Sequence, residues 1–385
     1  MAKTERIQNM TKGSPAKLIF TFAIPLMLGN VFQQFYTVVD TAIVGQALGV
    51  NALAALGAAD WLNWLVLGLI QGFAQGFSIY MAQRFGAEDH EGLNRSIGAT
   101  ISLSAVISIL TVILSQVAMA PVLRAMNTPE EIIGGAFTYL RIMFAGIPII
   151  MAYNVLASIL RALGDSKTPL YFLIFSSVLN IIFNLVLIKF CRLGVIGSAV
   201  GTVIAISISV ACCIIYIKRN YPILRLKKED WAYNPAFMRE HLNIAIPMSI
   251  QFSILALSIM VIQAVCNSFG EKIIVGFTIA LRIEQLATQP LMAIGLAMAT
   301  FAAQNYGAGK LSRIREAVKK ACLTSFVISL LMSTVMFFFG THIIGSVLDN
   351  PDPFVVQIGA SYLGISIMFY FFLGMIFIFK NTLQS

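Results

Sequence analysis

Two acidic residues stand out inside long apolar stretches of this sequence, Asp40 within residues 17–45 and Glu284 within residues 273–305. A charge inside a membrane span is costly, so such a residue by default marks an ion or substrate pathway. Counted from residues 270–272 at about 1.5 Å per residue, Glu284 falls near the middle of its span. Asp40 falls in the outer half of the first span. Either carboxylate could take up and release a cation.

Both acids also have a structural interpretation. Glu284 could pair with a basic group such as Arg282, although two residues apart on a helix they point to different faces. Asp40 could lie in the interfacial zone as a solvated charge. The sequence favours a functional role for Glu284 and leaves the two interpretations of Asp40 open.

Three polar residues accompany Asp40 in the first half of the chain. Asn180 and Asn184 are four residues apart, so they share one helix face, and Thr202 lies in the next apolar stretch. With Asp40 they could line one cavity that faces the outer side. The alternative is hydrogen bonding between helices, which Asn and Thr also provide.

Sequence signatures of catalysis are missing. His90-Glu91 is followed by Gly92-Leu93-Asn94, so the HExxH zinc pattern fails, and no GxxxxGK[ST] phosphate loop is present. The five cysteines have no metal spacing. We expect no enzyme activity, no metal and no cofactor, so any pumping must draw on an ion gradient.

The composition indicates the elements that hold these residues. Of 385 residues 58% are hydrophobic and 11% are charged, against roughly 25% charged residues in soluble domains. The sequence predicts an all-α, polytopic helical membrane protein, because ten stretches are long and apolar enough to span a bilayer. They lie near residues 17–45, 51–82, 97–120, 133–160, 168–190, 194–217, 242–268, 273–305, 320–345 and 355–380.

The basic residues predict the orientation. With the N-terminus inside, 20 of the 26 Lys and Arg residues fall on the inner side, 4 on the outer side and 2 within spans. This bias is the positive-inside pattern, so the net charge of +9 does not point to nucleic acid. We expect a multi-pass protein of the bacterial cytoplasmic membrane with a cytoplasmic N-terminus.

The chain repeats itself at an offset of about 222 residues. The matching segments are 23–25 with 245–247, 82–87 with 303–308, and 139–140 with 362–363. A unit of six spans keeps its orientation, so the repeat is parallel, as in many transporters. We expect an N-lobe at residues 1–217, a cytoplasmic linker at 218–241 and a C-lobe at 242–385.

The second lobe is shorter than the first, with four spans against six. The sequence is therefore expected to be a form that lacks two C-terminal helices, or else a protein of ten spans.

Proline and glycine mark bends and close packing. Pro25 and Pro247 occupy the same repeat position inside spans, where they could act as helix hinges or as static kinks. Gly68, Gly72 and Gly76 form a GxxxGxxxG pattern, which favours a face for close helix packing.

Several short motifs, weak alone but ordered along nearly the whole chain, give a resemblance to a known family. The chain resembles the multidrug and toxic compound extrusion (MATE) transporters, especially the bacterial branch. The motifs are Ala23-Ile24-Pro25, Asp40-Thr41-Ala42-Ile43-Val44-Gly45, Ala82-Gln83-Arg84-Phe85-Gly86-Ala87, Leu160-Arg161-Ala162-Leu163-Gly164-Asp165, Arg282-Ile283-Glu284 and Gly307-Ala308-Gly309.

The resemblance implies a two-lobed antiporter of six plus six helices that exports amphipathic, often cationic drugs in exchange for H⁺ or Na⁺. It implies ion coupling at Asp40 and Glu284, and an N-lobe polar cavity of Asn180, Asn184 and Thr202. Many members of the family that this chain resembles have Asp where this chain has Asn184. The resemblance therefore implies one carboxylate, and not two, in that cavity. We expect a monomer in the lipid bilayer with small-molecule substrates.

Two alternatives remain at this stage. A lipid-linked saccharide flippase of the same superfamily needs several basic residues in its cavity, whereas only Arg141 and Arg282 lie in spans. A non-transporting membrane fragment or scaffold would bind a fluorescent cation without gradient-driven efflux.

Overall fold

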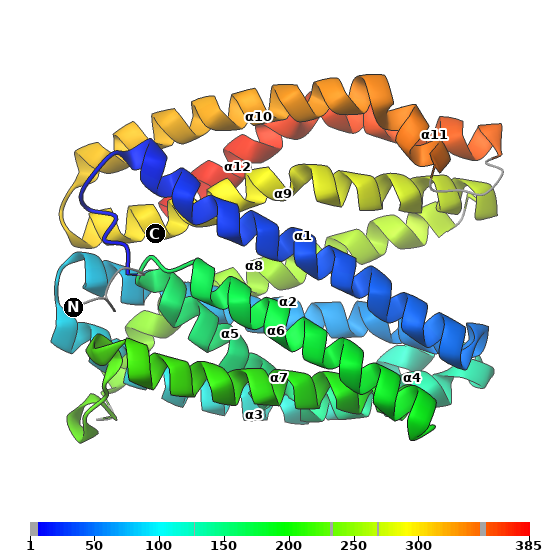
Figure 1. The fold of residues 1–385 in the computed structure, drawn as a ribbon, viewed down its shortest axis with the longest axis horizontal. Coiled ribbons are helices and arrows are strands. Elements are labelled where there is room, and N and C mark those ends of the chain that lie inside the picture. Colours follow the sequence, from blue (N-terminus) through cyan, green and yellow to red (C-terminus); the bar gives the residue numbers. More distant parts are fainter. Residues whose placement is uncertain (1–6, 127, 232–233, 268, 347–351) are drawn as a thin grey trace. The chain divides into compact units, whose positions relative to one another are not determined.

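The computed structural model describes residues 7–126, 128–231, 234–267, 269–346 and 352–385, and this part of the chain is helical without strands (Figure 1). Residues 232–233 of the predicted linker lie outside the described residues. The long helices are α1 (Pro15–Leu48), α2 (Val50–Gly86), α3 (His90–Ala125), α4 (Glu130–Ala145), α5 (Ile147–Ala162), α6 (Lys167–Asn184), α7 (Gly194–Asn220), α8 (Pro235–Asn267), α9 (Glu271–Gly307), α10 (Leu311–Ser346), α11 (Pro353–Ser366) and α12 (Tyr370–Leu383). The short ones are the π-helix η1 (Leu185–Phe190) and the 3₁₀-helices η2 (Pro222–Leu224), η3 (Lys228–Trp231) and η4 (Ile367–Phe369).

The predicted all-α membrane architecture is confirmed. Among the described residues nine helices are long and apolar enough to cross a membrane, where α6 with η1 counts as one helix and α11 with η4 and α12 as another. The bent pair α4 and α5 makes a tenth when it is counted as one span. That pair corrects one detail, because residues 133–160 were expected to form one helix and the pair is bent by 51°. Pro148 lies in the first turn of α5, where its missing N–H costs little, so the second helix starts there.

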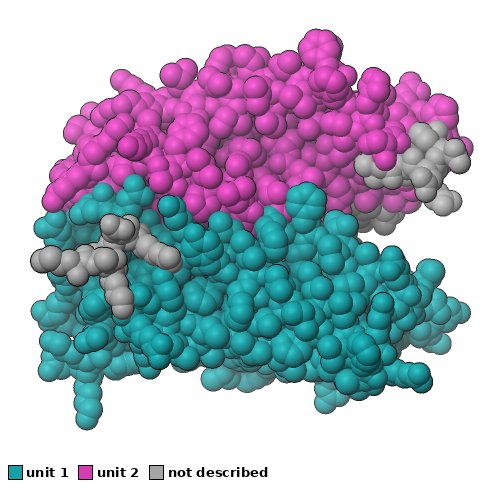
Figure 2. Space-filling model, viewed as in Figure 1, with its two compact units in different colours: residues 1–9, 32–257 teal, residues 10–31, 258–385 magenta. Residues whose placement is uncertain are grey.

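Packing divides the chain into two compact units (Figure 2). Unit 1 holds Met1–Asn9 and Phe32–Leu257, and unit 2 holds Met10–Val31 and Ser258–Ser385. The first part of α1 therefore packs in unit 2, and the first part of α8 packs in unit 1. These units do not coincide with the lobe boundaries at residues 217 and 242, because the repeat in the sequence defines the lobes and the packing of the backbone defines the units.

The glycine pattern of α2 explains why the start of α8 belongs to unit 1. A Cβ atom at Gly72 would overlap the backbone of Ser249, and a Cβ at Gly76 would overlap the backbone of Ala245. The Ser249 hydroxyl also donates to the Leu69 carbonyl at 3.2 Å. The expected close packing of this face is confirmed, and its partner is α8.

Unit 2 repeats this arrangement with α1 on α9. Phe22, Ala23 and Leu26 of α1 belong to one buried apolar cluster with Ala293 and Ala297 of α9. Ala23 and Ala245 are the same position of the repeat. Small residues at equivalent positions thus let the first part of α1 and of α8 approach its neighbour closely.

The backbone of the turns shows the repeat as well. Gly49, with φ 81°, precedes α2, and Gly270, with φ 96°, precedes α9. A positive φ suits glycine, which lets two long helices follow each other with almost no loop. Glu88 and Gly309, with φ of 59° and 71°, form a second matched pair.

The segment before α1 is bound to the end of α9 and the start of α10 in unit 2. The Met10 N–H donates to Gln304 Oε1 at 2.8 Å, and Asn305 Nδ2 donates to the Met10 carbonyl at 3.1 Å. Arg313 donates to the carbonyls of Met10 and Gly13 and to Asn305 Oδ1. The polar residues of the repeated motif 303–308 therefore hold the chain where it enters α1.

Candidate functional site

The four polar residues grouped from the first half of the sequence form one hydrogen-bonded network in unit 1. Asn184 Nδ2 donates to Asp40 Oδ1 and, at 2.9 Å, to Asn180 Oδ1. Asn180 Nδ2 donates to Thr202 Oγ1 at 2.7 Å, and the Thr202 hydroxyl donates to the Ser198 carbonyl at 3.0 Å. Helices α1, α6 and α7 each contribute to this network, which ends on the carboxylate.

The two asparagines of the network are buried, and one of their oxygens has no hydrogen-bond partner among the described residues. Asn184 is fully buried and Asn180 is nearly so, whereas Asp40 is only half-buried. Asn184 Oδ1 has no hydrogen-bond partner within the described part of the chain. It lies where a Cβ atom of residue 201 would be, so Gly201 of α7 makes room for the amide. An unpaired buried oxygen is uncommon and often marks a functional position.

A change of helix type occurs directly after Asn184. The α6 helix ends there and continues as the π-helix η1 through Phe190. π-helices are rare in proteins, and the short ones that occur often lie at functional sites. The wider turn here ends the span just beyond the two asparagines, before the chain returns into α7.

Two tyrosines of unit 1 were not predicted as site residues. Tyr36, one helical turn before Asp40, is hydrogen-bonded to Thr202. Tyr139 of α4 is 7% exposed and interacts electrostatically with Asp60 of α2 and, less strongly, with Asp40. The spacing of four residues between Tyr36 and Asp40 was the available sequence signal.

Glu284 of α9 has a different environment in unit 2. The Tyr362 hydroxyl of α11 donates to Glu284 Oε2 at 2.6 Å, and the Tyr362 ring stands edge-on to Phe277 with centroids 5.1 Å apart. Arg282 is exposed, and Tyr370 is buried with no partner for its hydroxyl among the described residues. Glu284 is therefore held by a tyrosine.

Tyr362 could have been found from the repeat. It matches Tyr139: the Tyr362 hydroxyl donates to Glu284, and Tyr139 interacts electrostatically with Asp60 and Asp40. The acids themselves do not occupy matching positions. The repeat thus conserves the aromatic hydroxyl and places the carboxylate differently in each half.

The two prolines named as hinges lie inside continuous helices. Pro25 is buried within α1, and Pro247 lies within α8 between Ala245 and Ser249, the residues that pack on α2.

The fold and the repeat define a polytopic helical membrane transporter. The family model MatE matches residues 25–186 and 247–385, and the chain belongs to this family.

The chain is similar to curated proteins along its whole length. It is 30% identical over 381 residues to the probable multidrug resistance protein YpnP of Bacillus subtilis, which covers 98% of this chain and 84% of that protein. It is 23% identical over 387 residues to the multidrug export protein MepA of Staphylococcus aureus, covering 100% and 84%.

Solved structures share the fold. One is the outward-facing conformation of a multidrug resistance MATE family transporter of the MOP superfamily, with a TM-score of 0.90 and 23% identity over 100% of this chain and 85% of that chain. Another is a MATE crystal structure in the straight conformation, with a TM-score of 0.89 and 24% identity over 99% and 85%.

Proposed function

We propose that this protein is a secondary active antiporter that exports amphipathic, often cationic compounds in exchange for a cation. Membership of the MatE family supports this proposal, as do the multidrug resistance and multidrug export names of similar proteins. We place it as a monomer in the bacterial cytoplasmic membrane with its N-terminus in the cytoplasm, on the basis of the distribution of Lys and Arg.

The observation that carries the proposal is the contact between Asn184 and Asp40. A half-buried carboxylate inside a span, held by an amide N–H, is a group that can take up and release a cation. Uptake of a cation at Asp40 weakens the attraction of the carboxylate for the Asn184 amide. The network that joins α1, α6 and α7 then differs between the loaded and unloaded states.

The same contacts favour H⁺ over Na⁺ as the coupled ion. Asn184 uses both N–H groups of its amide, one toward Asp40 and one toward Asn180, so it presents donors to the carboxylate. A metal cation at Asp40 needs several oxygen ligands, and the Asn184 N–H that lies against Asp40 Oδ1 would have to turn away from it. A proton needs only that carboxylate.

In the proposed cycle, ion uptake at Asp40 releases the drug outside, and drug loading from inside displaces the ion. Only a difference in affinity between the two states can drive this exchange. Glu284 with Tyr362 forms a second proposed coupling site, and Pro25 and Pro247 are proposed hinges.

The test is ethidium efflux from energised cells that lack other pumps, with Asp40→Asn beside the parent chain. The matched control is Glu91→Gln, because Glu91 is an exposed carboxylate at the start of α3. We expect efflux by the parent and by the control, and efflux at the empty-vector level from Asp40→Asn. Collapsing the pH gradient should stop efflux, and omitting Na⁺ should not. Efflux by Asp40→Asn at the parent rate would refute the role of Asp40.

A further inference from the structure

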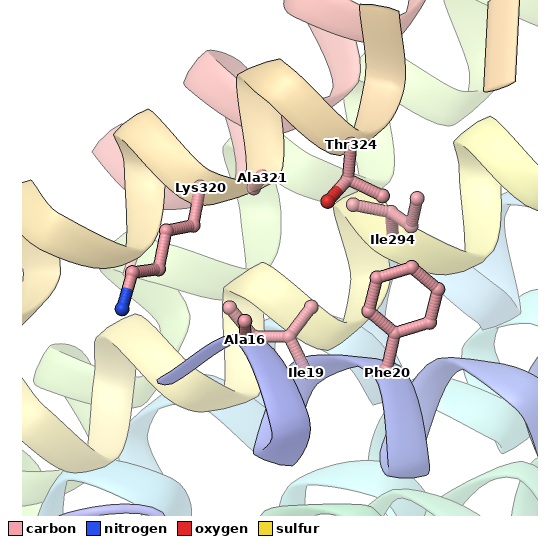
Figure 3. Close-up of a pocket in the computed structure, with 7 residues that line it drawn as sticks. All are labelled: Ala16, Ile19, Phe20, Ile294, Lys320, Ala321 and Thr324. Carbon is pink, nitrogen blue, oxygen red and sulfur yellow. The ribbon is translucent and has the colours of Figure 1, made fainter. Parts of the chain in front are cut away.

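A shallow hollow opens in unit 2 at the start of α1, away from both acidic residues (Figure 3). Its space, including the part open to the outside, is about 210 Å³. The floor consists of Ile19 of α1, Ile294 of α9 and Ala321 of α10, all buried. Phe20, which is 43% exposed, and Thr324 stand at the rim. The hollow therefore offers an apolar surface inside the predicted spans.

One end of the hollow is charged. Figure 3 shows Lys320 at one end and Phe20 at the other. Lys320 is the last charged residue of α10, and Lys17, beside the lining residue Ala16, is the last charge of α1 before Asp40. The hollow thus begins where two helices change from charged to apolar sequence, at the level of lipid headgroups.

Lys320 is paired with an exposed carboxylate, which a phosphate group could displace. Its ammonium is 2.5 Å from Glu316 Oε1, one turn earlier on the same helix, and the two side chains are 42% and 49% exposed. Exposed ion pairs of this kind hold their partners weakly. A lipid phosphate at the membrane surface can therefore replace Glu316 at modest cost.

We propose that this hollow binds an anionic phospholipid, with its phosphate at Lys320 and the first part of an acyl chain along Ile294 and Phe20. Basic pockets between spans are typical sites for anionic headgroups. A free phosphate would leave the exposed ring of Phe20 uncovered, whereas an acyl chain covers it. With the proposed orientation the lipid belongs to the cytoplasmic leaflet, and binding does not depend on the proposed transport.

The experiment uses Phe20→Trp as a reporter in a chain whose Trp61, Trp64 and Trp231 are changed to Phe. The protein is placed in phosphatidylcholine nanodiscs that contain either brominated phosphatidylglycerol or brominated phosphatidylcholine at equal mole fraction. Bromine in the acyl chain quenches a tryptophan that it contacts. We expect phosphatidylglycerol to be preferred roughly fivefold, the factor for one Lys at a membrane surface.

Three variants test the lysine. Lys320→Gln should remove the preference, whereas Lys319→Gln, which changes an exposed neighbouring lysine outside the hollow, should keep it. Glu316→Gln should increase the preference, because it removes the competing carboxylate. Native mass spectrometry of the chain with its own Phe20 and tryptophans, comparing retained phosphatidylglycerol with phosphatidylcholine, gives the same comparison without the reporter.

Equal quenching by the two lipids together with equal retention would overturn the proposal. So would the same loss for Lys319→Gln as for Lys320→Gln, which would show a general charge effect. Displacement of the preference by millimolar inorganic phosphate would identify a phosphate site instead. Loss of ethidium efflux in Asp40→Asn has no bearing on these outcomes.

Discussion

The contact between α2 and α8 permits a direct test of the packing, with Gly72→Ala against Gly57→Ala. Both glycines lie in the interior of α2, so alanine brings the same gain in helix propensity of about 1 kcal/mol at each. A Cβ at Gly57 meets nothing within 4 Å, whereas at Gly72 it overlaps backbone atoms of Ser249 and Met248. The propensity gain cancels in the comparison, and only the overlap remains. Overpacking costs about 1–3 kcal/mol, and backbone atoms yield less easily than the end of a side chain.

The assay is the free energy of unfolding of the purified protein in mixed detergent micelles. We expect Gly57→Ala to match or exceed the parent, and Gly72→Ala to fall below Gly57→Ala by about 1–3 kcal/mol. Adding Ser249→Ala to Gly72→Ala should not restore stability, because the overlapping atoms are backbone. Equal stability of the two glycine variants would refute the close approach of α8 to α2.

Three further outcomes are expected. Thr202→Val should slow ethidium efflux about fivefold or more, since it leaves a buried Asn180 N–H without its acceptor, whereas Thr202→Ser keeps the hydroxyl and should stay near the parent rate. Tyr362→Phe should slow efflux roughly tenfold by removing the donor to Glu284, and an unchanged rate would exclude Glu284 from coupling. Arg313→Gln should increase tryptic cleavage of the segment before α1 and lower the free energy of unfolding by about 1–3 kcal/mol, as a polar side chain with three acceptors is lost.

Helices α1 and α8 are each divided between the two compact units, which affects how they can bend. Residues 10–31 of α1 pack in unit 2, and the rest of α1 packs in unit 1. Residues up to Leu257 of α8 pack in unit 1, and the rest packs in unit 2. Each of these helices therefore belongs to both units. Pro247 lies within the part of α8 that packs on α2, so bending there must break the contacts of Ala245 and Ser249.

The sequence alone determined the class of protein and the positions of the apolar stretches. Ten apolar stretches need no partner to be recognised, since the bilayer requires each one to satisfy its backbone as a helix. The repeat, the GxxxGxxxG face and the isolated acids Asp40 and Glu284 were readable for the same reason, because each depends on spacing along one chain. The break at Gly146 was missed, since a proline inside an apolar run is compatible with both a bent span and two helices.

The tertiary structure decided which side chains meet. Asn184 reaches Asp40 across 144 positions of sequence, and Tyr362 reaches Glu284 across 78, so neither contact follows from local spacing. It also decided that the start of α8 packs on α2, because this depends on whether two small-residue faces approach to backbone contact. Periodicity shows that a helix has such a face, and only the packed structure shows which helix lies against it.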